Sequence, residues 1–196
     1  MLYRIGRIFF RIWYRIVFRY TVIGKENVPL DGPLVLASNH ISLWDPPTVG
    51  TPLDRKVHFM AKAELFDIPV IGTLFRTLGA FPVKRGGISK ESIRLAQQHL
   101  RSGNAMGIFP EGSRKNAGGM GKKGAASLAI KSGAAVVPVA IIGNYKWFRP
   151  MTIVYGKPVD LSPYAEATSD QLDEATEAIM SAIREQIRHY GVRRNN

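Results

Sequence analysis

The sequence predicts an α/β fold in which a sheet is covered by helices. Short apolar runs of strand length alternate with stretches of helical period, and this alternation is typical of α/β domains. With 196 residues, 45% of them hydrophobic, the chain is long enough for a single domain with a substantial core. This composition excludes a disordered tail and a two-domain enzyme.

Residues 1–24 form a first segment, which we predict to be an amphipathic helix lying on a membrane. At about 100° per residue, five arginines fall within an arc of roughly 120°: Arg4, Arg7, Arg11, Arg15 and Arg19. Apolar residues, several of them aromatic, occupy the rest of the helix, as in interfacial helices. No apolar run reaches the roughly 18 to 20 residues needed to span a bilayer. The alternative is that the apolar face closes the core of the domain.

Residues 25–196 form the α/β domain, which begins with a turn-rich linker at Pro29–Pro33. Apolar runs predict strands at Leu34–Ser38, Val57–Ala61, Gly79–Val83, Ala105–Phe109, Ala135–Ile142 and Met151–Tyr155. Helical periods predict helices at Pro69–Thr77, Ile88–Arg101, Lys122–Ser132 and Ser169–Tyr190.

The charge balance indicates an anionic partner. There are 27 Lys and Arg against 15 Asp and Glu, a net charge of +12, which suits nucleic acid, a membrane surface or a phosphorylated substrate. With no cysteine, the sequence excludes disulfides, thiolate metal sites and a cysteine nucleophile, and a reducing cytoplasmic setting is the default.

Two further patterns carry little weight. Gly119–Gly124 satisfies G-x-G-x-x-G, but no predicted strand immediately precedes it and no acidic residue follows about 20 residues later, so we expect a flexible glycine-rich entry to a helix. His58, His99 and His189 are scattered and lack metal-binding spacing, so we expect no metal site.

A histidine and a carboxylate five residues apart follow the predicted strand Leu34–Ser38. On a straight helix His40 and Asp45 would point about 140° apart, so a contact requires a turn between them. If that turn brings Asp45 to Nδ1 of His40, the carboxylate fixes the tautomer and leaves Nε2 free as a general base. The alternative is that Asp45 caps a helix that starts at Pro46, with His40 an ordinary loop residue.

Two other segments place phosphate-binding chemistry directly after predicted strands, where α/β folds tend to have their sites. Lys84 and Arg85 are adjacent cations followed by glycines. A second group combines a guanidinium fork, a hydroxyl and an accessible backbone N–H, which suit a phosphate monoester: Gly112, Ser113 and Arg114. Alternatively, each segment is an ordinary turn.

Glu111 is an acid within the second of these segments. Beside a phosphate it is expected either to orient Arg114 or to accept a hydrogen bond from a substrate hydroxyl.

Four motifs in this order resemble those of the glycerolipid acyltransferase family, and most closely its bacterial 1-acylglycerol-3-phosphate acyltransferases. They are Asn39-His40-x-Ser42-x-x-Asp45, Phe81-Pro82-x-Lys84-Arg85, Phe109-Pro110-Glu111-Gly112-Ser113-Arg114 and Val137-Pro138-Val139-Ala140-Ile141. The likeness runs from about Gly24 to Lys157 and implies a mixed, largely parallel sheet covered by helices.

The resemblance implies a reaction and assigns residues to it. His40 deprotonates the free hydroxyl of a lysophosphatidate, Asp45 orients His40, and the alkoxide attacks an acyl thioester of coenzyme A or acyl carrier protein to give phosphatidate. Arg85 and Arg114 hold the acceptor's phosphate, and Lys62 serves the phosphate or the oxyanion. The substrate-binding residues implied in full are Asn39, Ser42, Lys62, Lys84, Arg85, Glu111, Gly112, Ser113 and Arg114.

The resemblance implies an acyl thioester and lysophosphatidate as partners, with no cofactor. The amphipathic helix adds the anionic cytoplasmic face of the cell membrane, and we expect no metal and no nucleic acid. Two alternatives remain: a non-catalytic basic module that binds anionic lipid or nucleic acid, and an acyltransferase whose acceptor is glycerol 3-phosphate or another lysophospholipid. The charge lies on an aromatic helix and around glycine turns, not in a recognisable nucleic-acid reading module.

Overall fold

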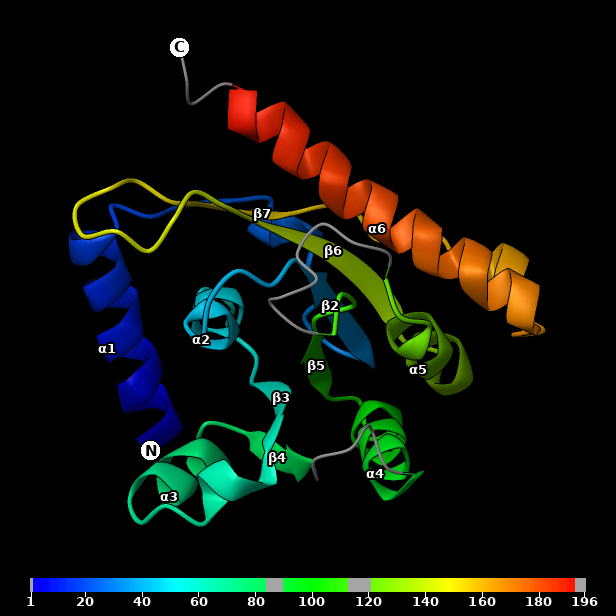
Figure 1. Cartoon of the computed structure of the whole chain (residues 1–196), viewed down its shortest axis with the longest axis horizontal. Coiled ribbons are helices and arrows are strands. Elements are labelled where there is room, and N and C mark those ends of the chain that lie inside the picture. The colour runs from blue at the N-terminus through cyan, green and yellow to red at the C-terminus, as the bar shows by residue number, and fades with distance from the viewer. Residues whose placement is uncertain (1, 84–89, 113–120, 193–196) are drawn as a thin grey trace.

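The computed structural model describes residues 2–83, 90–112 and 121–192. They form a seven-stranded sheet with the strand order β1-β7-β6-β2-β5-β3-β4 (Figure 1). The strands are β1 (Thr21–Ile23), β2 (Leu34–Ser38), β3 (Val57–Lys62), β4 (Ala80–Val83), β5 (Ala105–Ile108), β6 (Ala135–Ile142) and β7 (Thr152–Tyr155). Only β6 and β7 pair in antiparallel fashion, so the expected mixed, largely parallel sheet is confirmed.

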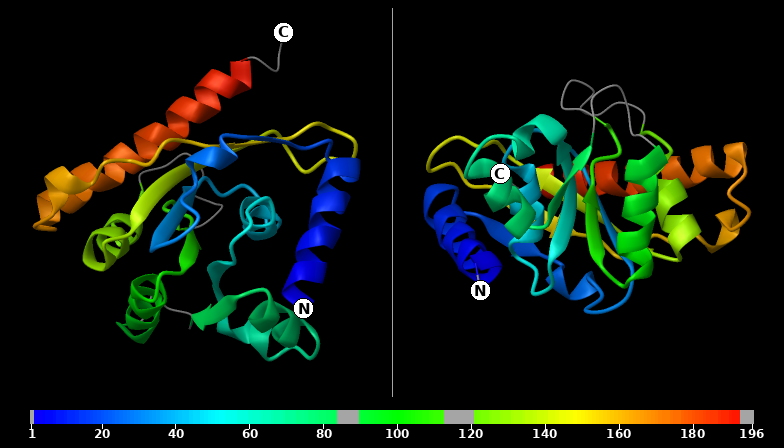
Figure 2. Two further views of the ribbon diagram at one scale, coloured as in Figure 1. Left: turned by 180° about the vertical axis from the view of Figure 1, so that it is seen from behind. Right: turned by 90° about the horizontal axis from the view of Figure 1, so that it is seen from below.

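Helices cover both faces of this sheet (Figures 1 and 2). They are α1 (Leu2–Val17), α2 (Asp45–Gly50), α3 (Ile71–Thr77), α4 (Lys90–Arg101), α5 (Gly124–Ser132) and α6 (Ser169–Val192). Because side chains alternate along a strand, Leu34 and Leu36 of β2 join a core with α1 and α2, whereas Val35 and Ala37 join a second core with α4, α5 and α6. All five residues of β2 are buried, as expected at the centre of a covered parallel sheet.

The six strands and four helices predicted within residues 25–196 are present, with boundaries that differ by at most two residues where they are described. The helix predicted over residues 1–24 is shorter and ends at Val17. Ile88 and Ser89, the predicted start of α4, lie outside the described residues. Among the α-helices and strands, two were not predicted. Helix α2 was mentioned only as an alternative for Asp45, and β1 lies where the first helix was expected to continue and pairs with β7 at the edge of the sheet.

Helix α1 is anchored to the domain by one side of its surface. Tyr14 and Val17 belong to the core that α2 shares. Arg11 donates from Nε to the carbonyl of Thr51 at 2.6 Å and from Nη2 to that of Pro52 at 2.7 Å. Because these carbonyls directly follow α2, the guanidinium sits at the negative end of that helix.

The arginines of α1 therefore do not form one membrane-facing stripe, as the helical period alone predicted. Arg7 also donates to the domain, through the carbonyl of Leu53 at 2.9 Å. Arg4 and Arg15 remain exposed, and so does Arg19, which lies beyond the end of the helix. The helical period predicted the helix correctly. Arg7 and Arg11 nevertheless face the domain, because α1 packs along the C-terminal end of α2.

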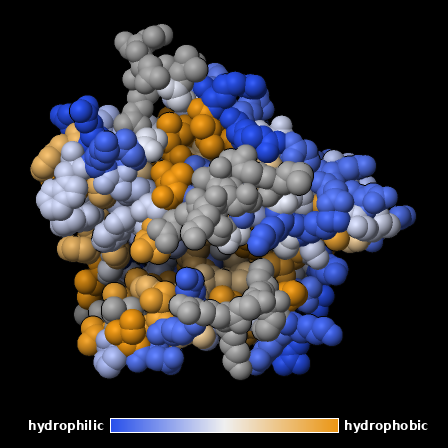
Figure 3. All heavy atoms as spheres, in the orientation of Figure 1, coloured by the Kyte–Doolittle hydropathy of each residue, from blue (hydrophilic) through white to orange (hydrophobic). Residues whose placement is uncertain are grey.

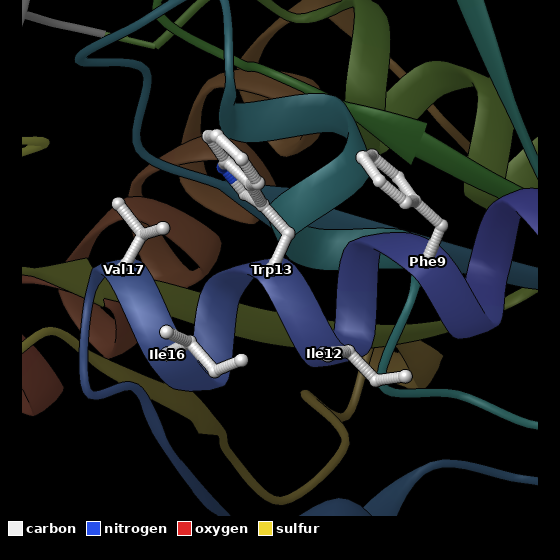
Figure 4. Close-up of a pocket in the computed structure, with 5 residues that line it drawn as sticks. All are labelled: Phe9, Ile12, Trp13, Ile16 and Val17. Carbon is white, nitrogen blue, oxygen red and sulfur yellow. The ribbon is translucent and has the colours of Figure 1, made fainter.

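An apolar stripe of α1 faces away from the domain. Each of its five side chains is 53–63% exposed: Ile5, Ile8, Phe9, Ile12 and Ile16. Figure 4 shows three of them, with Ile12 and Ile16 directed to the side of the helix opposite Trp13. In Figure 3 apolar residues gather along the lower left, over α1 and α3. Among the described residues, no helix is both long and apolar enough to cross a bilayer.

Candidate active site

The His40 turn lies at the carboxyl edge of the parallel strands. Strand β2 ends at Ser38 and α2 begins at Asp45, so the turn between them leaves the middle of the sheet. Strands β3, β4, β5 and β6 run parallel to β2 and end at the same edge, where α/β folds place their ligands. Pro46 and Pro47 suit the first turn of α2, because proline has a preset φ and no N–H to satisfy.

His40 and Asp45 are in direct contact. Nδ1 of His40 lies 2.6 Å from Oδ2 of Asp45, whose side chain is fully buried. The same oxygen accepts the backbone N–H groups of Ile41 at 2.6 Å and Ser42 at 2.7 Å. Since both amides can only donate, this oxygen is an acceptor and the proton of the pair lies on Nδ1. The lone pair of a neutral imidazole is then on Nε2, as a general base requires.

Tyr145 contacts the other oxygen of Asp45 and was not found from the sequence. Its hydroxyl donates to Oδ1 of Asp45 at 2.7 Å and lies 2.9 Å from Oγ1 of Thr48. Burial, together with the charge of Asp45, raises the pKa of Tyr145 well above its usual range, so the phenol keeps its proton. Asp45 and Tyr145 are 100 residues apart, and no spacing in the sequence signals their contact.

Asn39 holds the start of the turn against β6. Its Nδ2 donates to the carbonyl of Ile141 at 3.0 Å, and its Oδ1 accepts the N–H of Ile141 at 2.8 Å. Both polar atoms of the buried Asn39 amide are thus engaged by β6, and the expected role of Asn39 in substrate binding stays a prediction.

Glu111 fixes the turn from the other side. Its carboxylate is buried, and Oε2 accepts the backbone N–H of His40 at 3.0 Å. The sequence suggested a partnership with Arg114 or a substrate hydroxyl, and this stays a prediction because Arg114 lies outside the described residues. The structure adds a bond from the main chain beside the imidazole. The segment after β5 is thereby tied to the segment after β2.

The imidazole of His40 rests on an aromatic stack. The ring of Phe109 is nearly parallel to it, with centroids 4.1 Å apart, and Phe59 lies behind Phe109 at 6.1 Å. Gly107 makes room for this stack, since a Cβ there would lie 1.9 Å from the Phe59 ring. The stack restrains the imidazole plane while the Asp45 carboxylate restrains its edge.

The remaining predicted site residues follow strands that end at this edge. Lys62 is the exposed last residue of β3. Gly112 has φ +72°, a conformation that favours glycine, and its Cα is covered by the side chain of Lys122, a cation that motif spacing did not single out. The backbone N–H of Ser42 donates to Asp45, and its Oγ accepts the N–H of Trp44 at 3.3 Å. Four expected residues lie outside the described residues: Lys84, Arg85, Ser113 and Arg114.

Apolar side chains lie exposed beside the dyad. The turn presents Ile41, Leu43 and Trp44 to solvent, although it carries a charged and hydrogen-bonded site. The Trp44 ring also meets Phe10 of α1, with centroids 6.5 Å apart. The turn that carries the site thus touches the N-terminal helix through apolar side chains.

A family model described as Acyltransferase matches residues 19–142, more than half of the chain. A 1-acyl-sn-glycerol-3-phosphate acyltransferase from Bacillus subtilis is 34% identical over 171 residues, which cover 84% of this chain and 86% of that protein. A chloroplastic 1-acyl-sn-glycerol-3-phosphate acyltransferase from Arabidopsis thaliana is 35% identical over 134 residues, 66% of this chain and 37% of the relative.

The fold also has a solved counterpart. The crystal structure of the 1-acyl-sn-glycerophosphate acyltransferase PlsC from Thermotoga maritima matches with a TM-score of 0.70 and 27% identity, covering 94% of this chain and 78% of that one.

Proposed function

Since the chain belongs to the acyltransferase family, we propose that it transfers an acyl group from an acyl thioester to the free hydroxyl of 1-acyl-sn-glycerol 3-phosphate, giving phosphatidate. The observation that carries this proposal is the buried Asp45 carboxylate, which lies 2.6 Å from Nδ1 of His40. The chain is also similar to proteins named 1-acyl-sn-glycerol-3-phosphate acyltransferases.

His40 acts as the general base. Nε2 takes the proton of the acceptor hydroxyl as its oxygen attacks the thioester carbonyl, and the C–S bond then breaks. The thiolate leaves and receives the proton held by the imidazolium, so the enzyme is restored and no acyl-enzyme forms. General-base catalysis of this kind contributes roughly 10² to 10⁴ in rate. Asp45 stabilises the imidazolium through Nδ1.

Cations at the carboxyl edge of the sheet hold the acceptor's phosphate. Arg85 follows β4 and Arg114 follows β5, and both strands end at the edge where His40 lies. Lys62 adds positive charge from the end of β3, and Lys122 adds it from the segment just before α5. A guanidinium can bind two phosphate oxygens at once, which fixes the hydroxyl relative to His40.

The α1 stripe docks the enzyme on an anionic leaflet, at the cytoplasmic face of the cell membrane. Its five exposed apolar side chains belong to a segment without acids, since residues 1–25 contain neither Asp nor Glu, and the nearby Asp54 is paired with Arg11 and Lys25. Arg4, Arg15 and Arg19 are available to lipid headgroups, and at ~1 kcal/mol each they contribute at most ~3 kcal/mol. The lysophospholipid then reaches His40 along the apolar surface of Leu43 and Trp44.

The proposed reaction uses no cofactor. A thioester is already activated toward nucleophiles, so a base, an acceptor site and a donor site suffice. Coenzyme A and acyl carrier protein are both anionic carriers, and either suits the basic edge of the sheet.

Product analysis tests the proposal. Purified protein is given acyl-CoA or acyl carrier protein thioesters with equimolar lysophosphatidate and glycerol 3-phosphate, and lipid products are identified by mass spectrometry. We expect phosphatidate as the main product. Lysophosphatidate formed from glycerol 3-phosphate would reassign the acceptor. No acylated product from either donor would leave a lipid-binding protein as the better account.

A further inference from the structure

The connection between β6 and β7 presents two large aromatic side chains to solvent. In the sequence Lys146-Trp147-Phe148-Arg149, here called the aromatic loop, Trp147 is 69% exposed and Phe148 is 63% exposed. In Figures 1 and 2 this yellow connection projects beyond the sheet, next to the C-terminal end of α1. Soluble proteins rarely leave adjacent large rings in water without an interaction to serve.

The backbone of the aromatic loop is strained at Phe148. Phe148 has φ +58°, in the left-handed region that a bulky residue rarely adopts. A turn closes around it, with the N–H of Arg149 donating to the carbonyl of Lys146 at 3.1 Å. Strain of this kind persists where the surrounding structure imposes it, and it often marks a functional segment.

Backbone hydrogen bonds join the aromatic loop to the end of α1. The N–H of Phe148 donates to the carbonyl of Val17 at 2.7 Å, and the N–H of Met151 donates to the carbonyl of Phe18 at 3.0 Å. The loop and the helix end therefore form one surface. The α1 stripe ends nearby in the sequence at Ile16, which is 63% exposed.

Charge identifies the partner of this surface. Lys146 and Arg149 flank the two rings, and no Asp or Glu occurs anywhere in residues 112–159. Aromatic rings between cations suit the headgroup layer of an anionic bilayer, where ring bodies and charges are both accommodated. An acidic protein would satisfy the cations but would leave the continuous α1 stripe uncovered.

We propose that the aromatic loop is a second bilayer contact, with Trp147 and Phe148 entering the headgroup layer of an anionic membrane beside the C-terminal end of α1. This inference rests on the membrane-bound enzyme described under the proposed function. Two contacts fix the orientation of the protein on the bilayer, whereas one helix leaves it free to roll. Tyr145, adjacent to the loop, contacts Asp45, so the orientation set by the loop also sets that of the dyad.

Vesicle co-sedimentation of the full chain tests the proposal. The variant is Trp147→Ser with Phe148→Asn, because asparagine tolerates a left-handed backbone. Its matched control is Leu30→Ser, which removes a side chain that is 76% exposed before β2, at the opposite edge of the sheet. On vesicles of phosphatidylglycerol and phosphatidylcholine we expect about tenfold weaker binding of the variant and no change in the control.

A second variant, which changes only charge, keeps the test valid if the first variant fails to fold. Lys146→Gln with Arg149→Gln changes exposed side chains only, and we expect weaker binding with a reduced dependence on salt. Unchanged vesicle binding in both variants would overturn the proposal. So would unchanged vesicle binding combined with lost turnover on carrier-protein thioesters, since the loop would then dock the donor. Binding is measured without substrate, so absent turnover in the wild type would count against the proposed function alone.

Discussion

Asp45 is the residue on which the site converges. One oxygen accepts from the His40 ring and from two backbone amides of its own turn, and the other accepts from Tyr145. A buried carboxylate with these donors keeps a fixed position, and it holds the imidazole in one tautomer. Hydrogen-bonded partners of metal-binding histidines influence activity by 10- to 100-fold without touching substrate, and we expect a similar size of effect here.

Tyr145→Phe is therefore expected to lower kcat by about tenfold with little change in KM. The ring and its contact with Phe18 remain, and what is lost is the hydroxyl that contacts Asp45 and Thr48. The measurement is steady-state kinetics at fixed vesicle composition, with Tyr164→Phe as the control for losing a hydroxyl elsewhere. An unchanged kcat would show that Asp45 does not depend on this bond.

His58 is expected to make stability fall in acid. Burial, followed by the neighbouring charges of His99 and Lys56, lowers the pKa of His58 to about 4, against about 6.5 when unfolded. Between these two pKa values the unfolded chain binds more protons than the folded protein. The contribution of His58 to the free energy of unfolding is therefore complete above about pH 6.5 and is lost as the pH falls toward about 4.

Urea unfolding at about pH 7.5 and about pH 4.5 measures this effect. Wild type should lose about 1 kcal/mol more than His58→Asn, a value reduced for partial exposure of the ring. Asparagine retains a donor for the carbonyl of Gly79, which lies 3.0 Å from Nδ1. Equal losses in the two proteins would contradict the assignment.

The site residues differ in how well the sequence could predict them. His40 and Asp45 lie in one turn, so their spacing was enough to raise the possibility of a contact. Tyr145 becomes their neighbour only because β6 lies beside β2, and the two contacts of Asn39 with Ile141 of β6 were equally invisible in the sequence.

At the scale of elements, α1 and β5 carry the least obvious constraints. Helix α1 packs against the domain on one side and exposes an apolar stripe on the other. Arg7 and Arg11 bond to the domain, whereas Arg4 and Arg15 are exposed. Strand β5 has to leave space for an aromatic ring, so it needs a glycine in its interior. Each constraint can be tested with a pair of matched variants.

Arg11→Met should lower the free energy of unfolding by about 2 kcal/mol, since it leaves the carbonyls of Thr51 and Pro52 without charged donors. Arg15→Met is the matched change on the exposed side. It should leave stability unchanged but weaken binding to anionic vesicles about fivefold, the equivalent of ~1 kcal/mol. Equal effects of the two variants on stability would refute the division of roles.

Gly107→Ala should destabilise the protein by about 1–3 kcal/mol, because the new Cβ would overlap the Phe59 ring. Activity should fall as well, since Phe59 supports Phe109 behind His40. Gly124→Ala is the control: no atom lies within 4 Å of its Cβ position at the start of α5. Thermal unfolding of both variants decides, and equal midpoints would be inconsistent with the packing described.

Sequence periodicity predicted the elements that have enough residues to show it. Strand β6 has eight residues, nearly all buried, and its boundaries were predicted to the residue. Strand β1 has only three residues and directly follows the helix, so no alternation could reveal it. Its position depends on pairing with β7 from the other end of the domain.

On the scale of the whole molecule, charge and apolar surface are concentrated where α1 meets the β6–β7 connection. Residues 1–25 and 112–159, which supply these two elements, contain no acidic residue. The net charge of +12 was visible in the sequence, but the strand order that brings these segments together was not. The pairing of β1 with β7, which are far apart in the sequence, brings α1 and the β6–β7 connection to one surface.

The central claim is that His40 and a lipid acceptor together release thiol from an acyl thioester. The most direct measurement is thiol release with and without lysophosphatidate, comparing wild type with a His40→Ala protein shown to be folded by circular dichroism. We predict acceptor-dependent release by the wild type and its loss, by at least about 10²-fold, in the variant. Full acceptor-dependent release by folded His40→Ala would contradict the assignment of the base and with it the mechanism.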